Sequence, residues 1–219
     1  MPAAFVFDAY GTLFDVHSVQ RRCEAFWPGK GPQLSQLWRS KQLEYTWQRS
    51  LMRRYEPFTR VTEDALAYAC QALGLALDAA RTDALMSEYR RLELYPDVRD
   101  ALARMKGMKL AILSNGSPDM LEPLVAQSGL SFDAVLSVDA LRVYKPAPEV
   151  YQFAVDRLGV APAQVGFVSS NCWDALGAKS FGFSVNWINR GGAPVDRLGF
   201  EPDAILRGLG DLPRRASIQ

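Results

Sequence analysis

Residues 5–13 read Phe5-Val6-Phe7-Asp8-Ala9-Tyr10-Gly11-Thr12-Leu13, and this stretch decides the fold. A short apolar run ends at one carboxylate, Asp8, and is followed by a glycine and a hydroxyl side chain. Such a run is typical of a strand buried in a parallel sheet, because helices cover both faces of these sheets. Asp8 then lies at the carboxyl end of the strand, where open α/β sheets bind ligands. Taken alone, the stretch also fits a strand and a tight turn, with Asp8 bonded to the loop.

The composition predicts a globular protein with a sizeable core. The 219 residues are 48% hydrophobic and carry a formal net charge of +1, which suits one large domain or a core with a smaller one. Because the chain lacks long basic or apolar runs, we expect neither a nucleic-acid partner nor a membrane. Cys23, Cys70 and Cys172 are widely spaced and predict no disulfide framework. The start resembles no signal peptide, so a cytoplasmic location is expected.

The order of predicted elements indicates a helical insertion into a sheet. Residues 17–94 contain helix-like periodicity and no convincing strand, with a helix expected to begin at Thr62 and another over 78–94. From residue 109 strands and helices alternate, which predicts a doubly wound, Rossmann-like parallel sheet. The core is therefore expected to span residues 1–14 and 96–219, with a helical-bundle cap at 15–95. The expected strands are 109–113, 134–138, 164–169 and 183–188, and the expected helices are 119–128, 147–158 and 173–181.

Polar side chains follow several of the predicted strands. Each group also has a local explanation, such as a helix cap or a solvated loop. Because the carboxyl ends of parallel strands meet at one edge of a sheet, their coincidence predicts a common site instead. The groups are Asp8 with Thr12, Ser114 with Asn115, Lys145, and Ser169 with Asn171 and Asp174.

Four segments together resemble the haloacid dehalogenase superfamily, and within it the L-2-haloacid dehalogenases. They are residues 8–13 (DAYGTL), 113–117 (LSNGS), 144–146 (YKP) and 169–174 (SSNCWD). The likeness covers essentially the whole chain, including residues 37–47 of the predicted cap. It implies a hydrolase that acts on small 2-haloalkanoates, works without a cofactor and forms a homodimer.

Two positions depart from the pattern of most members of this superfamily, which are magnesium-dependent phosphatases. Their first motif is Asp-x-Asp, but the second aspartate is replaced here by Tyr10. Their last motif carries two carboxylates, one of which is replaced by Ser170. Magnesium takes oxygen ligands, usually carboxylates, so a site made from Asp8 and Asp174 alone would be poor. No metal is therefore expected.

The resemblance also implies roles for individual residues. Asp8 is the nucleophile, and Arg39 holds the departing halide with help from Asn171. Lys145 orients Asp8 through a charge-assisted hydrogen bond, and Tyr151 orients Lys145. Ser114 and Asn115 hold the substrate carboxylate, and Thr12 lies beside the nucleophile. An apolar wall is formed by Tyr10, Leu43, Phe58 and Trp173. Asp174 activates the hydrolytic water with help from Lys145 or Ser169.

These assignments predict hydrolysis of L-2-haloalkanoic acids to D-2-hydroxy acids with inversion, through an ester on Asp8. One alternative is a magnesium-dependent phosphatase that uses the same Asp8. Another is a non-catalytic binding module, since a fold does not fix a function. The only histidine, His17, is expected to be solvated, which disfavours chemistry built on a histidine base.

Overall fold

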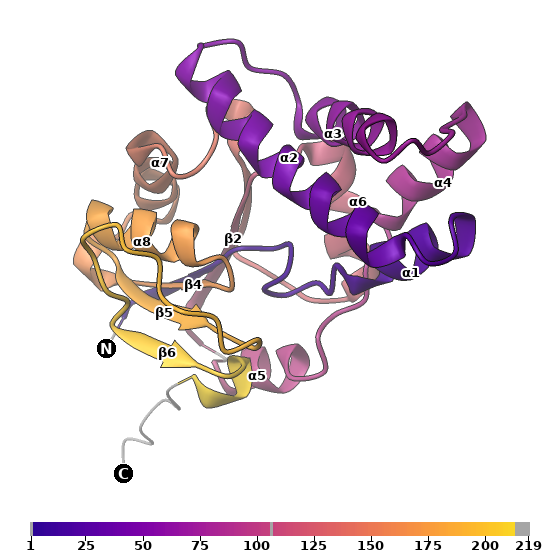
Figure 1. The fold of residues 1–219 in the computed structure, drawn as a ribbon. Coiled ribbons are helices and arrows are strands. Elements are labelled where there is room, and N and C mark those ends of the chain that lie inside the picture. Colours follow the sequence, from indigo (N-terminus) through magenta and orange to yellow (C-terminus); the bar gives the residue numbers. More distant parts are fainter. Residues whose placement is uncertain (1, 106, 213–219) are drawn as a thin grey trace.

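The computed structural model describes residues 2–105 and 107–212, and these form one parallel sheet with helices around it (Figure 1). The strand order in this six-stranded sheet is β3-β2-β1-β4-β5-β6, and every neighbouring pair is parallel. The predicted doubly wound α/β class is confirmed. The strands are β1 (Ala4–Phe7), β2 (Lys109–Ser114), β3 (Ala134–Ser137), β4 (Val165–Ser169), β5 (Ser184–Ile188) and β6 (Ala204–Leu206).

Five helices of the described residues lie between β1 and β2 in the chain, and the first four form a layer of their own beyond the carboxyl ends of the strands (Figure 1). The longest of them, α2, packs against α1 and α3. The predicted boundaries of the core (1–14 and 96–219) and of the cap (15–95) stay a prediction. Residues 213–219 of the predicted core lie outside the described residues. The helices of this insert are α1 (His17–Phe26), α2 (Gly31–Leu51), α3 (Phe58–Ala72) and α4 (Ala79–Glu88).

The remaining helices connect the strands. In Figure 1, α7 and α8 lie together on one side of the sheet and α5 and α6 on the other. These helices are α5 (Val98–Arg104), α6 (Pro118–Ser128), α7 (Pro148–Leu158) and α8 (Cys172–Phe181), with 3₁₀ turns at Val138–Ala140, Pro162–Gln164 and Leu209–Asp211. Among the helices of the described ranges, none combines the length and apolar character needed to span a bilayer.

Two sequence predictions about helices were wrong, and one strand was missed. Thr62 does not begin a helix, because α3 starts at Phe58 and buries Thr62 completely. The helix expected over 78–94 ends at Glu88. Strand β6 was not predicted, since its three residues at the sheet edge give no usable alternation. At Thr62 the pattern of a hydroxyl before acidic residues suggested a cap, but the side chain is used inside the insert instead.

The strand register brings the functional candidates together. Phe7 pairs with Ile112 on β2 and with Val168 on β4, and the Asp8 amide donates to the Val168 carbonyl at 2.9 Å. The first residues after β1 therefore lie beside the ends of β2 and β4. Gly11 then turns the chain with a φ of +87°, a conformation open to glycine and costly for other residues.

Candidate active site

Asp8 is almost completely buried, at 6% exposure, and three side chains hold its carboxylate. Thr12 Oγ1 and Asn171 Nδ2 each donate to Asp8 Oδ2 at 3.0 Å. Lys145 Nζ donates to the other oxygen, Oδ1, at 3.2 Å. The Thr12 hydroxyl oxygen also accepts from the Ser170 amide at 2.8 Å. Loops after three different strands thus fix one carboxylate in one orientation.

Lys145 is 1% exposed and joins two buried carboxylates. Its ammonium lies 2.9 Å from Asp174 Oδ2 as well as 3.2 Å from Asp8 Oδ1. Burial alone lowers the pKa of Lys145, but the charges of Asp174 and Asp8 raise it above its ordinary value. The lysine is therefore charged at neutral pH and supplies the positive charge that the two carboxylates need.

Asp174 lies in the first turn of α8 and is fully buried. Tyr151 donates its hydroxyl to Asp174 Oδ1 at 2.9 Å. Burial raises the pKa of Asp174, against the opposing effect of Lys145. Burial also raises the pKa of Tyr151 well above its ordinary value, so the phenol stays protonated. In the structure Tyr151 contacts Asp174, and it acts on Lys145 only through this carboxylate.

Ser114, Asn115 and Ser169 stand at the ends of β2 and β4, as the sequence predicted. Ser114 Oγ accepts from the Gly116 amide at 3.0 Å, and Ser169 Oγ accepts from the Asn171 amide at 3.2 Å. The Asn115 side chain accepts from the Lys145 amide at 3.0 Å. The Asn115 carboxamide therefore positions the lysine loop, a contact that the sequence did not suggest.

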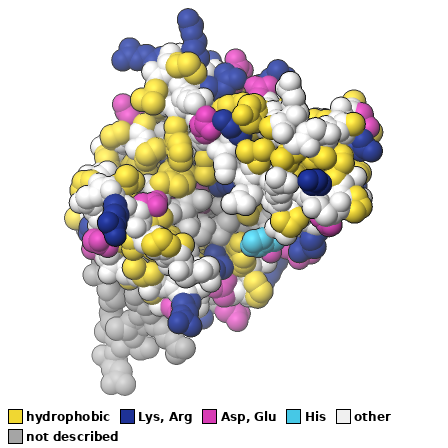
Figure 2. Space-filling model, in the orientation of Figure 1, with side chains coloured by type: hydrophobic (Ala, Val, Ile, Leu, Met, Phe, Trp, Pro, Cys, Tyr) yellow, Lys and Arg dark blue, Asp and Glu magenta, His cyan; other side chains and the backbone are white. Residues whose placement is uncertain are grey.

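Aromatic side chains enclose one side of the site. Tyr10 and Phe58 are buried with ring centroids 6.1 Å apart, and Gly116 is needed because a Cβ there would lie 2.7 Å from the Tyr10 ring. Trp173 packs edge-on against Trp47 of α2, with ring centroids 5.5 Å apart. Hydrophobic side chains are visible on this face of the molecule over both the insert and the core (Figure 2). Leu43 lies half-buried on α2, one turn after Arg39.

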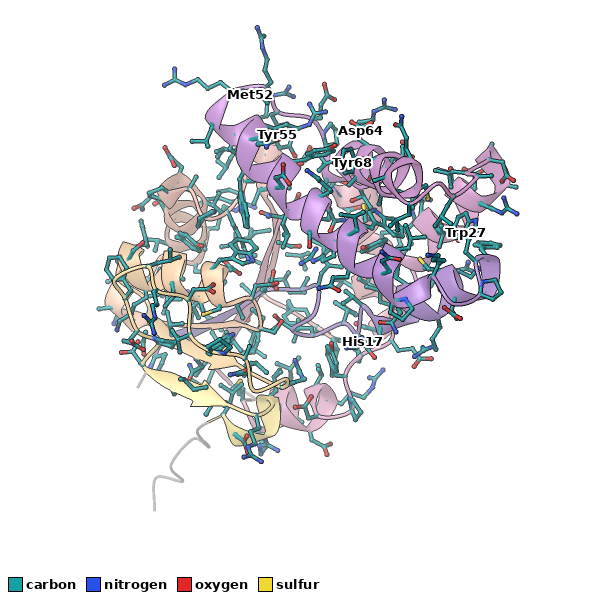
Figure 3. The ribbon with its side chains drawn as sticks, in the orientation of Figure 1. His17, Trp27, Met52, Tyr55, Asp64 and Tyr68 are labelled. Atoms are coloured by element: carbon teal, nitrogen blue, oxygen red, sulfur yellow. The ribbon has the colours of Figure 1, made fainter. Side chains whose placement is uncertain are left out.

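Arg39 reaches the core from the insert. Its guanidinium donates through NH1 to Gln42 Oε1 at 2.6 Å and through NH2 to Asn171 Oδ1 at 3.5 Å. Since Asn171 also donates to Asp8, its side chain bridges the arginine and the candidate nucleophile. His17, labelled in Figure 3 at the start of α1, is exposed.

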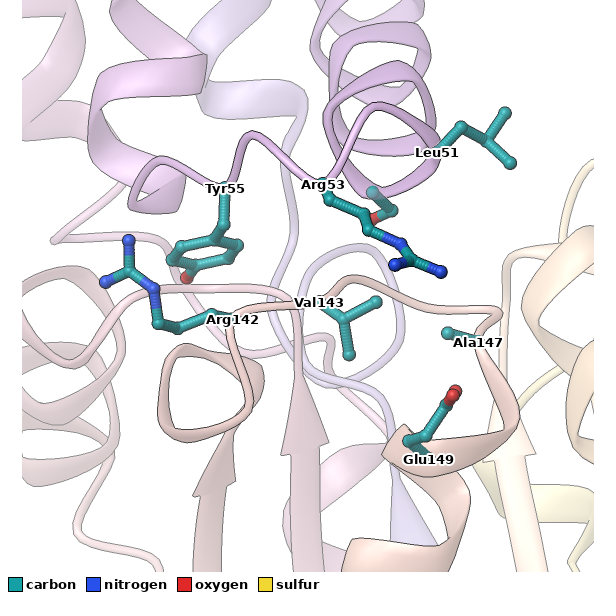
Figure 4. Close-up of a pocket in the computed structure, with 8 residues that line it drawn as sticks. Leu51, Arg53, Tyr55, Arg142, Val143, Ala147 and Glu149 are labelled. Carbon is teal, nitrogen blue, oxygen red and sulfur yellow. The ribbon is translucent and has the colours of Figure 1, made fainter.

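Two cavities lie between the insert and the core, and only one reaches these residues. A cavity of about 290 Å³ is lined by Tyr10, Arg39, Ser170 and Asn171 together with Arg190. Its volume is near the lower limit of about 300 Å³ for small-molecule sites. A cavity of about 390 Å³, shown in Figure 4, lies between the end of α2 and the start of α7. None of its lining residues is among the candidate site residues described above.

Two residues near the site were missed by the sequence analysis. Gln42 bonds to Arg39, and Arg190 donates to the carbonyls of Gly11 and Thr12 at 3.1 Å each. Arg190 also stacks over Tyr95 at 3.8 Å. Arg190 follows β5, so the rule that strand ends form the site would have found it. Gln42 gave no comparable signal, because a glutamine on a helix is usually exposed.

The residues around Asp8 do not suit a magnesium ion. The Lys145 ammonium already lies between the Asp8 and Asp174 carboxylates, and Tyr10 and Ser170 occupy the positions where phosphatases carry further carboxylates. Within residues 2–105 and 107–212, no group of three or more His, Cys, Asp or Glu is arranged to hold a metal. A neutral phenol and a hydroxyl add no negative charge to attract a divalent cation.

Comparisons with known proteins agree with this geometry. The family model of haloacid dehalogenase-like hydrolases matches residues 2–182. A (S)-2-haloacid dehalogenase from Pseudomonas sp. strain YL is 52% identical, over 90% of this chain and 87% of that protein. A crystal structure of an L-2-haloacid dehalogenase superposes with a TM-score of 0.93 at 50% identity, over 95% of this chain and 96% of the other. The L-2-haloacid dehalogenase from Xanthobacter autotrophicus with chloropropionic acid covalently bound gives 0.90 at 47% identity, over 97% of both chains.

Proposed function

The chain belongs to the haloacid dehalogenase-like hydrolases, and among them to the (S)-2-haloacid dehalogenases; from this membership we propose that it hydrolyses L-2-haloalkanoic acids to D-2-hydroxy acids. The geometry around Asp8 is the observation that supports this proposal. The Asp8 carboxylate is buried and held by Lys145, Thr12 and Asn171, and the Arg39 guanidinium lies on the far side of Asn171. A fixed carboxylate near a cation is what displacement of a halide requires.

In the first step one Asp8 oxygen attacks carbon 2 of the substrate. Oδ2 already accepts two hydrogen bonds, whereas Oδ1 accepts one, from Lys145. Because each carboxylate oxygen has two lone-pair sites, we assign the attack to Oδ1. A bond forms between Oδ1 and carbon 2, and the carbon–halogen bond breaks with its electron pair leaving on the halide. Attack opposite the halogen inverts the carbon centre once.

The halide leaves toward the insert. Arg39 is the cation that the insert contributes to the cavity lined by Asn171, whose side chain bonds to Asp8, and the charge of Arg39 stabilises the developing anion. Ser114 and the loop after β2 hold the carboxylate of the substrate. The apolar wall of Tyr10, Leu43, Phe58 and Trp173 excludes water during this step, which strengthens the electrostatic interactions inside the site.

In the second step water hydrolyses the ester. Asp174 accepts a proton from a water molecule as the water oxygen attacks Cγ of Asp8, and the bond between Cγ and Oδ1 then breaks. The departing alkoxide oxygen takes that proton from Asp174 and leaves as the hydroxyl of the product, while the new carboxyl group of Asp8 loses its proton to solvent. Lys145 holds Asp174 in place at 2.9 Å, and Ser169 lies at the adjacent strand end. Since this attack is on the carboxyl carbon of Asp8, carbon 2 is not inverted again.

A single turnover in heavy-oxygen water, with the enzyme in excess, tests this pathway. The product should be unlabelled and the peptide that contains Asp8 should gain one heavy oxygen. As a control, Asp8→Asn should remain folded and release no halide. If the product carried the label after one turnover and the peptide did not, Asp8 would be a general base that activates water directly.

We further propose that the protein is a homodimer. The insert exposes several large apolar side chains, among them Met52 and Tyr68, both labelled in Figure 3, and Leu51 at 85% exposure. Such side chains favour contact with another protein surface. Sedimentation of the wild type and of Leu51→Asp measures the state, and a wild-type monomer at micromolar concentration would contradict the proposal. The cytoplasmic location stays a prediction.

A further inference from the structure

Gln42 is a polar side chain that the insert buries completely. Its exposure is 0%, and both ends of its carboxamide are used. Oε1 accepts from Arg39 NH1 at 2.6 Å, and Nε2 donates to Thr62 Oγ1 at 2.7 Å. These two contacts fix which end of the amide is oxygen and which is nitrogen, since a guanidinium only donates. Gln42 is thus held in one orientation against Arg39.

The hydrogen bonds continue on both sides of Gln42. On the insert side, Thr62 Oγ1 donates to the Phe58 carbonyl at 2.7 Å, and Trp38 Nε1 donates to the Thr62 carbonyl at 2.8 Å. Gln42 is therefore anchored, through Thr62, to the backbone of α3, which the buried Trp38 ring contacts.

On the core side, the same path leads to the nucleophile. Arg39 NH2 reaches Asn171 Oδ1 at 3.5 Å, and Asn171 Nδ2 donates to Asp8 Oδ2 at 3.0 Å. One path of hydrogen bonds thus joins the backbone of α3 to the carboxylate of Asp8.

An arginine side chain needs such an anchor when it stabilises a leaving group. Arg39 is half-buried, and its long flexible side chain loses rotamer entropy when it is held in place. The neutral Gln42 oxygen holds the guanidinium without cancelling its charge. A carboxylate at the same position would pair with Arg39 and weaken the field that the arginine directs at the departing halide.

We infer that Gln42 is a positioning residue for the reaction, which aims the Arg39 guanidinium at the leaving halide and is itself fixed by Thr62. The inference rests on the proposed dehalogenase function. Displacement of Arg39 by about 1 Å is enough to cost on the order of 100-fold in rate. A chloride leaving group needs more stabilisation than a bromide, so loss of Gln42 slows the chloride reaction more.

The test measures single-turnover release of halide from L-2-chloropropionate and L-2-bromopropionate. Gln42→Met keeps the length of the side chain and removes both hydrogen bonds. Its matched control is Gln48→Met, the same change on the exposed part of α2, where the Gln48 side chain bonds only to Glu44 among the described residues. Wild-type release of both halides is established first, and its absence would overturn the proposed function rather than the role of Gln42.

We expect Gln42→Met to slow chloride release roughly 10- to 100-fold, to slow bromide release less, and to leave KM nearly unchanged. Gln48→Met should keep the wild-type ratio of the two rates. Equal slowing of both halogens, or no slowing, would overturn the inference, since a purely structural role does not depend on the leaving group.

A second pair of variants tests the same idea if Gln42→Met does not fold. Thr62→Val removes the hydroxyl that holds Gln42 Nε2, and Thr62→Ser retains it. The valine variant should shift the chloride-to-bromide ratio in the same direction by a smaller factor, and the serine variant should restore the ratio. A valine variant with the wild-type ratio would contradict the role of Gln42.

Discussion

Replacement of Lys145 by methionine should strongly destabilise the protein above about pH 5. The ammonium is 1% exposed, and the side chains of its two partners, Asp8 and Asp174, are 9% and 0% exposed. Removal of one partner of a buried ion pair costs about 3–5 kcal/mol, because the charge that remains has no compensation. That cost is a large part of the roughly 5–15 kcal/mol by which a domain is stable.

The cost should depend on pH in a defined direction. Without Lys145, a buried carboxyl group binds its proton more tightly in the folded state than in the unfolded chain, so its folded pKa is raised. The stability that this proton provides is complete below the unfolded pKa of about 3.9 and is lost as pH rises through the folded pKa. Lys145→Met should therefore recover stability relative to wild type as pH falls from 8 to 5, by at most about 1.4 kcal/mol per pH unit for each carboxyl group that takes up a proton.

Urea unfolding at pH 5 and pH 8 measures these effects in five proteins: wild type, Lys145→Met, Asp174→Asn, the double variant and a control. The double variant Lys145→Met with Asp174→Asn should be more stable than Lys145→Met alone at pH 8, because it removes one of the two buried charges that Lys145 compensates. Lys179→Met is the control: it breaks an exposed ion pair of α8 with Asp203, worth about 0–1 kcal/mol. Additive single effects, or a Lys145→Met deficit that is equal at both pH values, would refute the reasoning.

Three further outcomes are expected from the proposed chemistry. Halide release should persist in excess chelator and gain nothing from added magnesium, because Lys145 holds the position between the two carboxylates; activity restored by magnesium would favour a phosphatase-like site. L-2-chloropropionate should give D-lactate while the D-enantiomer reacts at least roughly 100-fold more slowly, since one misplaced reacting centre costs that much; chiral chromatography of the product decides. Asp174 must be ionised to accept a proton from water, and burial raises its pKa. The kcat should therefore fall as pH decreases, with a midpoint above 3.8, the ordinary pKa of an aspartate. A midpoint at or below 3.8 would exclude Asp174 as the base.

The sheet was predictable because its strands are short apolar runs that end in turns and polar residues. Residues 4–7, 109–114 and 165–169 have this form, and all three became central strands. The edge strand β6 has no fully buried side chain, so periodicity is weak there, and helix α5 spans only seven residues, which is short for a helical pattern to be recognised. Helix limits in the insert were less accurate, because its helices bury side chains against one another rather than against a sheet.

The core half of the site followed from the sequence because strand order places it. Asp8, Ser114 and Ser169 stand at strand ends, and parallel pairing alone brings them to one edge. Arg39 was identified only through the family resemblance, since nothing in the spacing of α2 says which side chain faces the core. Gln42 and Thr62 depend on the packing of α2 against α3, and no local pattern distinguishes a buried glutamine from an exposed one.

The two halves of the site have different physical tasks, and this explains their placement. In the proposed mechanism the core supplies the groups that form and hydrolyse the ester, namely Asp8, Lys145 and Asp174, which are fixed by strand ends and burial. The insert supplies Arg39, which acts on a halide present in only one step. Among the described residues, Arg39 is tied to the core at 3.5 Å through Asn171 and to its own insert at 2.6 Å through Gln42. The arginine therefore follows the insert, and any movement of the insert relative to the sheet would change halide stabilisation before it changed the nucleophile.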